Sequence, residues 1–141
     1  MRLRGFMHPG ITCDAGTSLA DAAREMERTN VGSIVVVTGR RISGIVTDRD
    51  LAVRGLGREM ASTTPVEEVM TKQVVSMRDT ADVFDAAAEM SHSGCRRLPV
   101  VDAKGDLQGI VTLDDLTILF AHEADFLAQT VASGSTATRT T

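Results

Sequence analysis

Two stretches of the chain, residues 11–51 and 75–116, show the same order of hydrophobic and polar positions. In each stretch, apolar residues recur at positions i, i+3, i+4 and i+7, which is the spacing of one helix face. These residues are Leu19, Ala22, Ala23 and Met26 in the first stretch and Val83, Ala86, Ala87 and Met90 in the second. An apolar run of strand length follows each predicted helix, at 34–37 and 98–101. A turn-rich segment and a second strand, 42–47 and 107–112, complete a predicted hairpin.

The two stretches are copies of one unit. Leu19 and Val83 lie 64 positions apart, and this offset holds as far as the first strand of each hairpin. After one extra residue near 103–105, the Gly-Ile-Val-Thr of 44–47 aligns with that of 109–112. Loops absorb such differences in length. Each copy also begins with a short extended segment, at 11–13 and 74–77, so the predicted order of elements is β-α-β-β-α.

One copy is too small to build a self-sufficient core. We therefore expect an α/β (α+β) fold in which two repeats, residues 5–60 and 61–125, pack through their sheets about a pseudo-twofold axis. Asp48 and Leu113 begin the last helix of each copy, and the second of these is predicted to run to about Val131. Thr64-Pro65 predicts the start of a connecting helix, with Thr64 as its N-cap. The small and polar residues 133–141 predict a disordered tail.

Composition narrows the classes of partner. The net charge of −4 argues against a nucleic-acid partner, because such binding needs a basic surface. No apolar run approaches the roughly 20 residues of a membrane span, and residues 1–10 lack the apolar core of a secretory signal. Two cysteines, Cys13 and Cys95, make neither a disulfide framework nor a zinc site. We therefore expect a cytoplasmic protein with reduced thiols and no membrane partner.

Candidate binding chemistry lies where the second strand of each hairpin ends. Asp50 follows Thr47 by three positions, and Asp115 follows Thr112 in the same way. A carboxylate placed there can accept hydrogen bonds from a vicinal diol such as a ribose, and the hydroxyl can bind the same sugar or a phosphate. The alternative is that these acids only cap their helices, which is the interpretation we favour for Asp48.

A pair of arginines distinguishes the two copies. Arg96 and Arg97 precede the second copy's first hairpin strand, whereas the first copy has Gly32 and Ser33 there. Neighbouring residues of a strand point to opposite faces, so one arginine is expected to reach a cleft between the copies and bind phosphate. We expect one cationic cleft and one neutral cleft. The alternative is two solvated arginines without a ligand.

These segments resemble known family signatures. Residues 44–51 and 109–116 resemble a signature of the CBS-domain family, and 97–102 resembles its second signature. Segments 66–71 and 6–9 resemble the family's lead into a repeat. The tandem arrangement resembles a Bateman module, and the resemblance covers roughly residues 5–125.

The resemblance implies a non-enzymatic sensor of adenosyl ligands: AMP, ADP, ATP, NAD-type dinucleotides or S-adenosylmethionine. One implied cleft uses Thr112, Asp114 and Asp115 with Arg96 or Arg97, closed by Thr12 and Val31. The other uses Thr47, Arg49 and Asp50, closed by Ser76 and Cys95. The resemblance further implies a homodimer paired through its helices, a regulated protein as a possible partner, and no required cofactor.

Other functions stay open. The chain could be a dimeric interaction scaffold that ignores nucleotides, or a redox-responsive protein that uses Cys95, whose thiol lies beside Arg96. A disulfide between Cys13 and Cys95 also stays open. An enzyme is the least favoured class, because no local motif supplies a nucleophile together with a base. His8, His92 and His122 lack the spacing of metal ligands.

Overall fold

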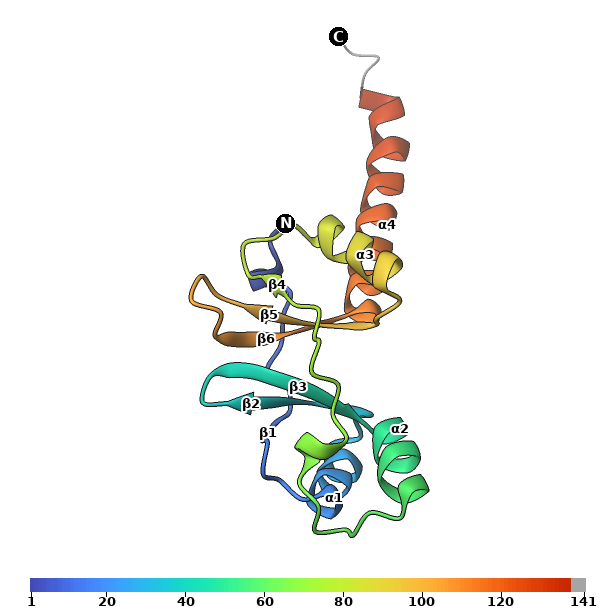
Figure 1. Ribbon diagram of the computed structural model, residues 1–141. Helices are drawn as coiled ribbons and strands as arrows, with labels where there is room; N and C mark the ends of the chain where they lie inside the picture. The colour runs from blue at the N-terminus through green and yellow to red at the C-terminus, as the bar shows by residue number, and fades with distance from the viewer. Residues whose placement is uncertain (138–141) are drawn as a thin grey trace.

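The computed structural model describes residues 1–137, which form two α/β halves stacked sheet against sheet (Figure 1). The first half contains β1 (Thr12–Asp14), α1 (Leu19–Thr29), β2 (Ser33–Thr38), β3 (Arg41–Thr47) and α2 (Asp48–Asp50). The second half contains β4 (Met77–Arg78), α3 (Val83–Ser93), β5 (Arg97–Val101), β6 (Leu107–Thr112) and α4 (Leu113–Ala137). Beyond α2, a π-helical turn (Leu51–Gly55) and a 3₁₀ turn (Leu56–Arg58) continue the helical path. The predicted α/β class and the β-α-β-β-α order are confirmed.

Each sheet has three strands, in the orders β1-β2-β3 and β4-β5-β6. The first strand of each sheet is parallel to the second, and the second is antiparallel to the third. Ser33 pairs with Thr47 and Arg97 with Thr112, so the start of each hairpin lies beside its end. The two sheets face each other along a seam, and both hairpin turns lie at one end of it, away from the starts of β2 and β5 (Figure 1). At that end the carbonyl of Arg40 accepts the N–H of Leu107.

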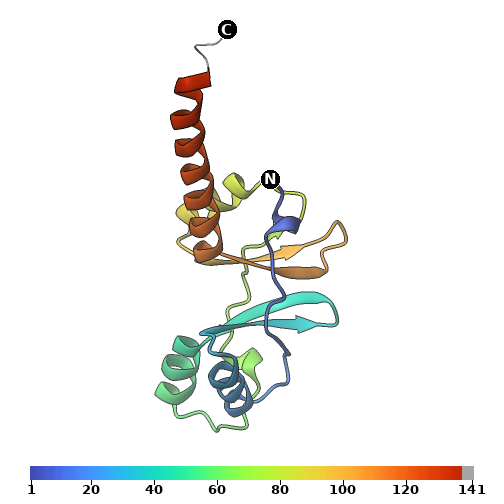
Figure 2. The same ribbon diagram turned by 180° about the vertical axis from the view of Figure 1, so that it is seen from behind.

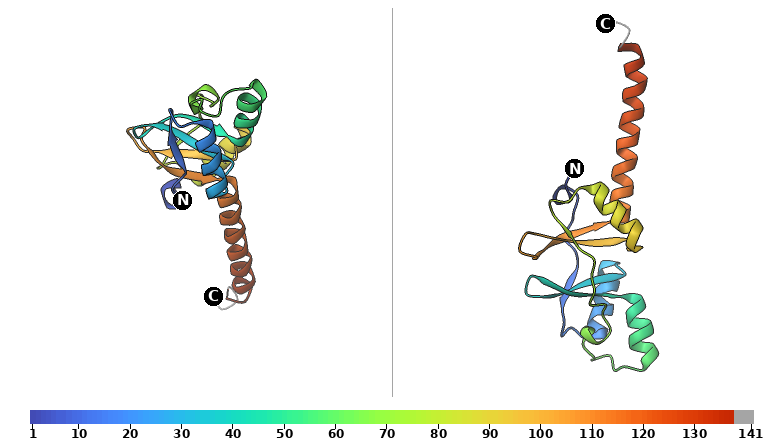
Figure 3. Two further views of the ribbon diagram at one scale, coloured as in Figure 1. Left: turned by 90° about the horizontal axis from the view of Figure 1, so that it is seen from below. Right: turned by 45° about the horizontal axis from the view of Figure 1, so that its top comes forward.

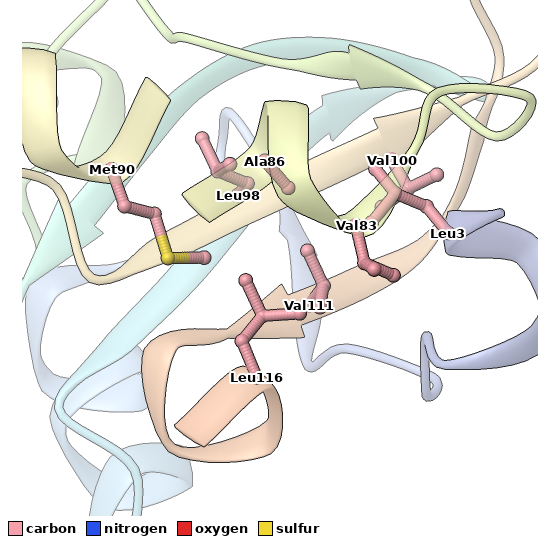
Figure 4. Packing of buried hydrophobic residues seen from close by; sticks show 8 residues of the cluster. All are labelled: Leu3, Val83, Ala86, Met90, Leu98, Val100, Val111 and Leu116. Carbon is pink, nitrogen blue, oxygen red and sulfur yellow. The ribbon is translucent and has the colours of Figure 1, made fainter. Parts of the chain in front are cut away.

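Two separate cores lie between each sheet and its own helices. The predicted helix stripes supply Leu19, Ala22 and Met26 to one core and Val83, Ala86 and Met90 to the other. Figure 4 shows the second core, where these side chains meet those of β5, β6 and α4. Side chains alternate along a strand, so Val35 and Pro99 face the opposite sheet, and both are buried.

Side-chain caps explain where the first helix of each half begins. Ser18 Oγ accepts the backbone N–H of Asp21 at 3.1 Å at the start of α1. Asp82 Oδ1 accepts that of Phe84 at 2.8 Å at the start of α3. The bond from Phe84 also contributes most to holding the pKa of the Asp82 carboxyl below its ordinary value. Each cap satisfies an N–H that the first helical turn leaves without a backbone acceptor.

The segments that lead into the two halves are exchanged. Leu3, in a 3₁₀ turn (Leu3–Gly5), is buried in the core of the second half, whereas Val66 and Val69 are buried in the core of the first. Paired backbone hydrogen bonds hold each leading segment against the last strand of the opposite half. His8 and Ile110 exchange N–H···O bonds of 3.0 and 2.9 Å, and Thr71 and Ile45 exchange bonds of 2.8 and 2.9 Å. Neither half therefore has a complete core without the chain of the other.

The prediction that a connecting helix begins at Thr64-Pro65 is wrong. Only one 3₁₀ turn forms, Val66–Glu68, and Pro65 before it is extended with no side-chain cap. The backbone here has other partners, because the Thr64 carbonyl accepts the N–H of Leu19 and Val66 donates its N–H to Thr17. Pairing with the start of α1 therefore replaces the helix.

Helix α4 is longer than predicted. It runs past Val131 to Ala137, so residues 133–137 continue a helix where a disordered tail was expected, and 138–141 lie outside the described residues. No proline interrupts this stretch, so the helix continues although four of its five residues are serine, glycine or threonine, which are weak helix formers. Figures 2 and 3 show the second part of α4 standing clear of the rest of the molecule. Over residues 1–137, no helix is both long and apolar enough to cross a bilayer.

Candidate functional site

The two Thr/Asp pairs singled out in the sequence form matching helix starts. Thr47 Oγ1 accepts the N–H of Asp50 at 3.0 Å, and Asp50 Oδ2 accepts the N–H of Thr47 at 3.0 Å. Thr112 and Asp115 make the same two bonds, each of 3.1 Å. Both pairs are capping boxes. One carboxylate oxygen and the hydroxyl of each pair are therefore already bonded to the backbone.

The expectation that Asp48 caps α2 is wrong. Thr47 is the N-cap of α2, because its hydroxyl lies one residue earlier and already takes the N–H of Asp50. Asp48 Oδ1 instead accepts the N–H of Arg49 at 2.8 Å. A Cβ added at Gly32 would lie 3.2 Å from Asp48 Oδ2. The missing side chain at Gly32 thus leaves room for this carboxylate beside the start of β2.

A cavity of about 830 Å³ opens at the end of the seam opposite the hairpin turns. Both halves line it: Gly32, Ser33, Ile45, Thr47, Asp48 and Arg49 from the first, and Gly94, Cys95, Arg96 and Arg97 from the second. Ligand pockets for molecules of nucleotide size typically have about 300–1,000 Å³. The cavity is therefore large enough for such a molecule to touch both halves at once.

We expected Arg96 or Arg97 in one cleft, with Thr112 and Asp115, and Thr47 and Arg49 in a second, neutral cleft. The structure places both groups of basic residues around one cavity. Arg96 and Arg97 line the same cavity as Thr47 and Arg49, so three arginines and one aspartate, Asp48, line one cavity. Both neighbouring arginines reach it because β5 begins only at Arg97. Arg96 lies in the turn after Gly94, whose φ of +75° ends α3, and strand alternation does not apply to it.

The other predicted site residues do not line this cavity. Asp115 borders a cavity of about 310 Å³ beside α4, and its Oδ2 lies 3.2 Å from His8 Nε2. Ser76 borders one of about 260 Å³ with Arg41 and Lys72, at the hairpin end of the seam. The residues outside the 830 Å³ cavity are Thr12, Val31, Asp50, Ser76, Thr112, Asp114 and Asp115. Ile45 also lines the 830 Å³ cavity and contributes an apolar side chain there, and the sequence analysis did not select it as a site residue.

The two cysteines are free thiols. Cys95 Sγ accepts a hydrogen bond from Ser93 Oγ at 3.2 Å, and Cys13 packs against the first core. Burial raises the pKa of the Cys13 thiol, which keeps it in the less nucleophilic form. Within residues 1–137, no group of three or more His, Cys, Asp or Glu side chains is placed to hold a metal ion.

Comparisons with known proteins agree with this architecture. The family model described as "CBS domain" matches residues 3–56 and 66–122. The "CBS domain-containing protein YhcV" of Bacillus subtilis (strain 168) is 38% identical over 107 residues, which cover 76% of each chain.

Two solved structures are similar in fold. The first is CBSX2 in complex with AMP, with a TM-score of 0.76 and 27% identity, covering 87% of this chain and 98% of that one. The second is the CBS domain pair of protein MJ0100 in complex with 5-methylthioadenosine and S-adenosyl-L-methionine, with the same TM-score, identity and coverage. A family model that matches both halves, together with this shared fold, shows that the chain is a tandem pair belonging to the CBS domain family.

Proposed function

We propose that the chain is a regulatory module that binds an adenine nucleotide in the 830 Å³ cavity. The observation that carries the proposal is the convergence of Arg49, Arg96 and Arg97, from both halves, on one cavity of suitable size. Arginine is suited to phosphate because its planar guanidinium donates two parallel hydrogen bonds. The adenosyl ligands of similar CBS pairs support the same chemical class.

The charge of the cavity favours AMP, ADP or ATP over S-adenosylmethionine. With three arginines and one aspartate, the lining carries a formal charge of +2. S-adenosylmethionine brings a sulfonium cation near these groups, whereas a nucleotide brings a negative phosphate. Coulomb's law favours the nucleotide, most strongly where the cavity excludes water.

We assign roles to the lining residues as follows. Arg96 and Arg97 bind the phosphate, Ile45 packs on the base, and Thr47 lies beside the sugar. Asp50 and Asp115 lie outside this cavity, so they have no role in binding this ligand. For them we retain a proposed ribose contact through Oδ1 with a ligand bound elsewhere, since the capping boxes use Oδ2. The ligand is an effector and not a substrate, so the chain is not proposed to be an enzyme. Its binding shifts an equilibrium only if one conformation binds it more tightly.

The cellular setting is also proposed. The free thiols Cys13 and Cys95 agree with a reducing, cytoplasmic location. We propose a homodimer paired through the helices on the outer faces of the sheets, and a regulated protein that responds to the bound nucleotide.

Titration calorimetry with AMP tests the site. In Arg97→Gln we expect the dissociation constant to rise about tenfold or more, because a charge-assisted hydrogen bond contributes about 1.5–3 kcal/mol. Arg58→Gln is the matched control, since Arg58 is exposed and does not line the cavity. Equal affinity of the two variants, or tighter binding of S-adenosylmethionine than of AMP, would contradict the proposal.

A further inference from the structure

The second part of α4 is not covered by other parts of residues 1–137. Every residue from 121 to 133, here called the distal segment, is exposed. Figures 1 and 3 show this part of the helix projecting beyond both sheets. Isolated helices of about 12–15 residues are only marginally stable in water, and packing of an apolar face stabilises most helices. The distal segment therefore needs a partner surface if the helix is to persist.

An apolar stripe continues along α4 from the core into the distal segment. Leu116 is buried in the second core, and Phe120 packs against it. Leu127 and Val131 follow these two residues by eleven positions, close to three helical turns, and so lie on the same face. Their exposed fractions are 60% and 72%. The face that is covered near the start of α4 is thus open farther along.

The open surface extends onto α3 at the foot of the distal segment. The ring of Phe84 stacks on Phe120, with centroids 5.1 Å apart and planes 7° apart, while 62% of Phe84 remains exposed. Phe126, 66% exposed, widens the apolar surface of the helix itself. Monomeric proteins rarely expose a large contiguous apolar patch unless it binds something.

Charge indicates how two such surfaces can meet. The distal segment contains Glu123 and Asp125 but no lysine or arginine. A parallel pair of these helices would place Glu123 beside its counterpart, and like charges repel. An antiparallel pair centred on Leu127 places Glu123 opposite the uncharged Thr130 and Val131 and opposes the two helix dipoles. A second copy in this orientation matches the surface in apolar character and keeps each Glu123 away from its counterpart.

We propose that the distal segment of α4 packs antiparallel against the distal segment of a second copy, with Leu127 near the twofold axis. The contact is self-complementary, as a closed twofold interface requires. It does not depend on nucleotide binding, and it is separate from pairing through the outer-face helices of the body.

The mass of the particle in solution tests this contact. Leu127→Lys puts two positive charges together at the axis, whereas Gln129→Lys is a matched control on the opposite face. Each substitution adds one lysine four residues after an acid, Glu123 or Asp125, so helix propensity and local ion pairing are alike. By sedimentation equilibrium we expect the mass of Leu127→Lys to be lower than that of the wild type and of Gln129→Lys, because this substitution removes the distal contact and leaves the proposed contact of the body in place. Equal masses for all three proteins would overturn the proposal.

Crosslinking tests the orientation, in a background with Cys13→Ser and Cys95→Ser. In an antiparallel pair, Leu127→Cys forms an intermolecular disulfide under mild oxidation and Val131→Cys does not. Crosslinking of both variants would show a parallel pair, and crosslinking of neither would show no pair; either result overturns the proposal. Binding of wild-type chain to neutral lipid vesicles with no change in particle mass for Leu127→Lys would also overturn it, in favour of a lipid surface.

Discussion

Gly44 and Gly109 occupy places where a side chain would collide with a crossing backbone. A Cβ on Gly44 would lie 2.7 Å from the carbonyl oxygen of Thr71, and one on Gly109 would lie 2.8 Å from that of His8. These glycines served in the sequence only to align the two copies. Their physical role depends on the exchange of the leading segments, which bring the backbones of Thr71 and His8 against β3 and β6.

Replacing Gly109 should therefore cost more than an ordinary surface substitution. Gly109→Ala forces His8 away from Ile110 and strains their paired backbone bonds, so we expect a loss of about 1–3 kcal/mol in the free energy of unfolding. Gly5→Ala is the control, because no atom lies within 4 Å of a Cβ there. Urea denaturation measures both. If the two variants have the same midpoint, the close approach at Gly109 does not constrain the fold.

At the scale of elements, the helix starts have a structural role that precedes any ligand. The reciprocal bonds of Thr112 and Asp115 fix the first turn of α4 just where β6 ends. The same holds for Thr47 and Asp50 at α2. The two interpretations of these acids, cap and ligand contact, therefore do not exclude each other, since the cap uses only one carboxylate oxygen.

The cap predicts a measurable loss of stability without ligand. Thr112→Val removes the hydroxyl that accepts the N–H of Asp115, and we expect about 0.5–2 kcal/mol of destabilisation. Thr117→Val is the same substitution one turn later, on an exposed residue whose hydroxyl only bonds back to the Leu113 carbonyl. Thermal unfolding should show a lower midpoint for Thr112→Val alone. Equal midpoints would mean that the Thr112 hydroxyl does not stabilise α4.

Elements with strong periodicity could be predicted, and elements that depend on distant partners could not. The helices at 19–26 and 83–90 and the strands after them have clear patterns and form as expected, although Ala23, predicted to lie on the apolar stripe, is exposed. The 3₁₀ turns at Leu3 and Val66 are too short to carry a period, and their cores lie in the opposite half. The shared position of Arg96 and Arg97 depends on where β5 begins, and element boundaries are the least predictable feature of a sequence.

At the scale of the whole molecule, the pseudo-twofold arrangement places the start of β2 and the start of β5 at one end of the seam. The 830 Å³ cavity thus draws Thr47 and Arg49 from one half and Arg96 and Arg97 from the other. Each half also holds the leading segment of the other in its core. A ligand in this cavity would therefore contact two bodies that are already interlocked, which is how its binding could alter both.

Hydrogen–deuterium exchange of the full chain with and without AMP tests this central claim most directly. If the nucleotide bridges the halves, saturating AMP slows amide exchange in 45–49 and in 94–97 together, and Arg97→Gln weakens both effects at subsaturating AMP. Protection confined to one of these segments, or no protection at millimolar AMP, would contradict the account of a ligand bound between the two repeats.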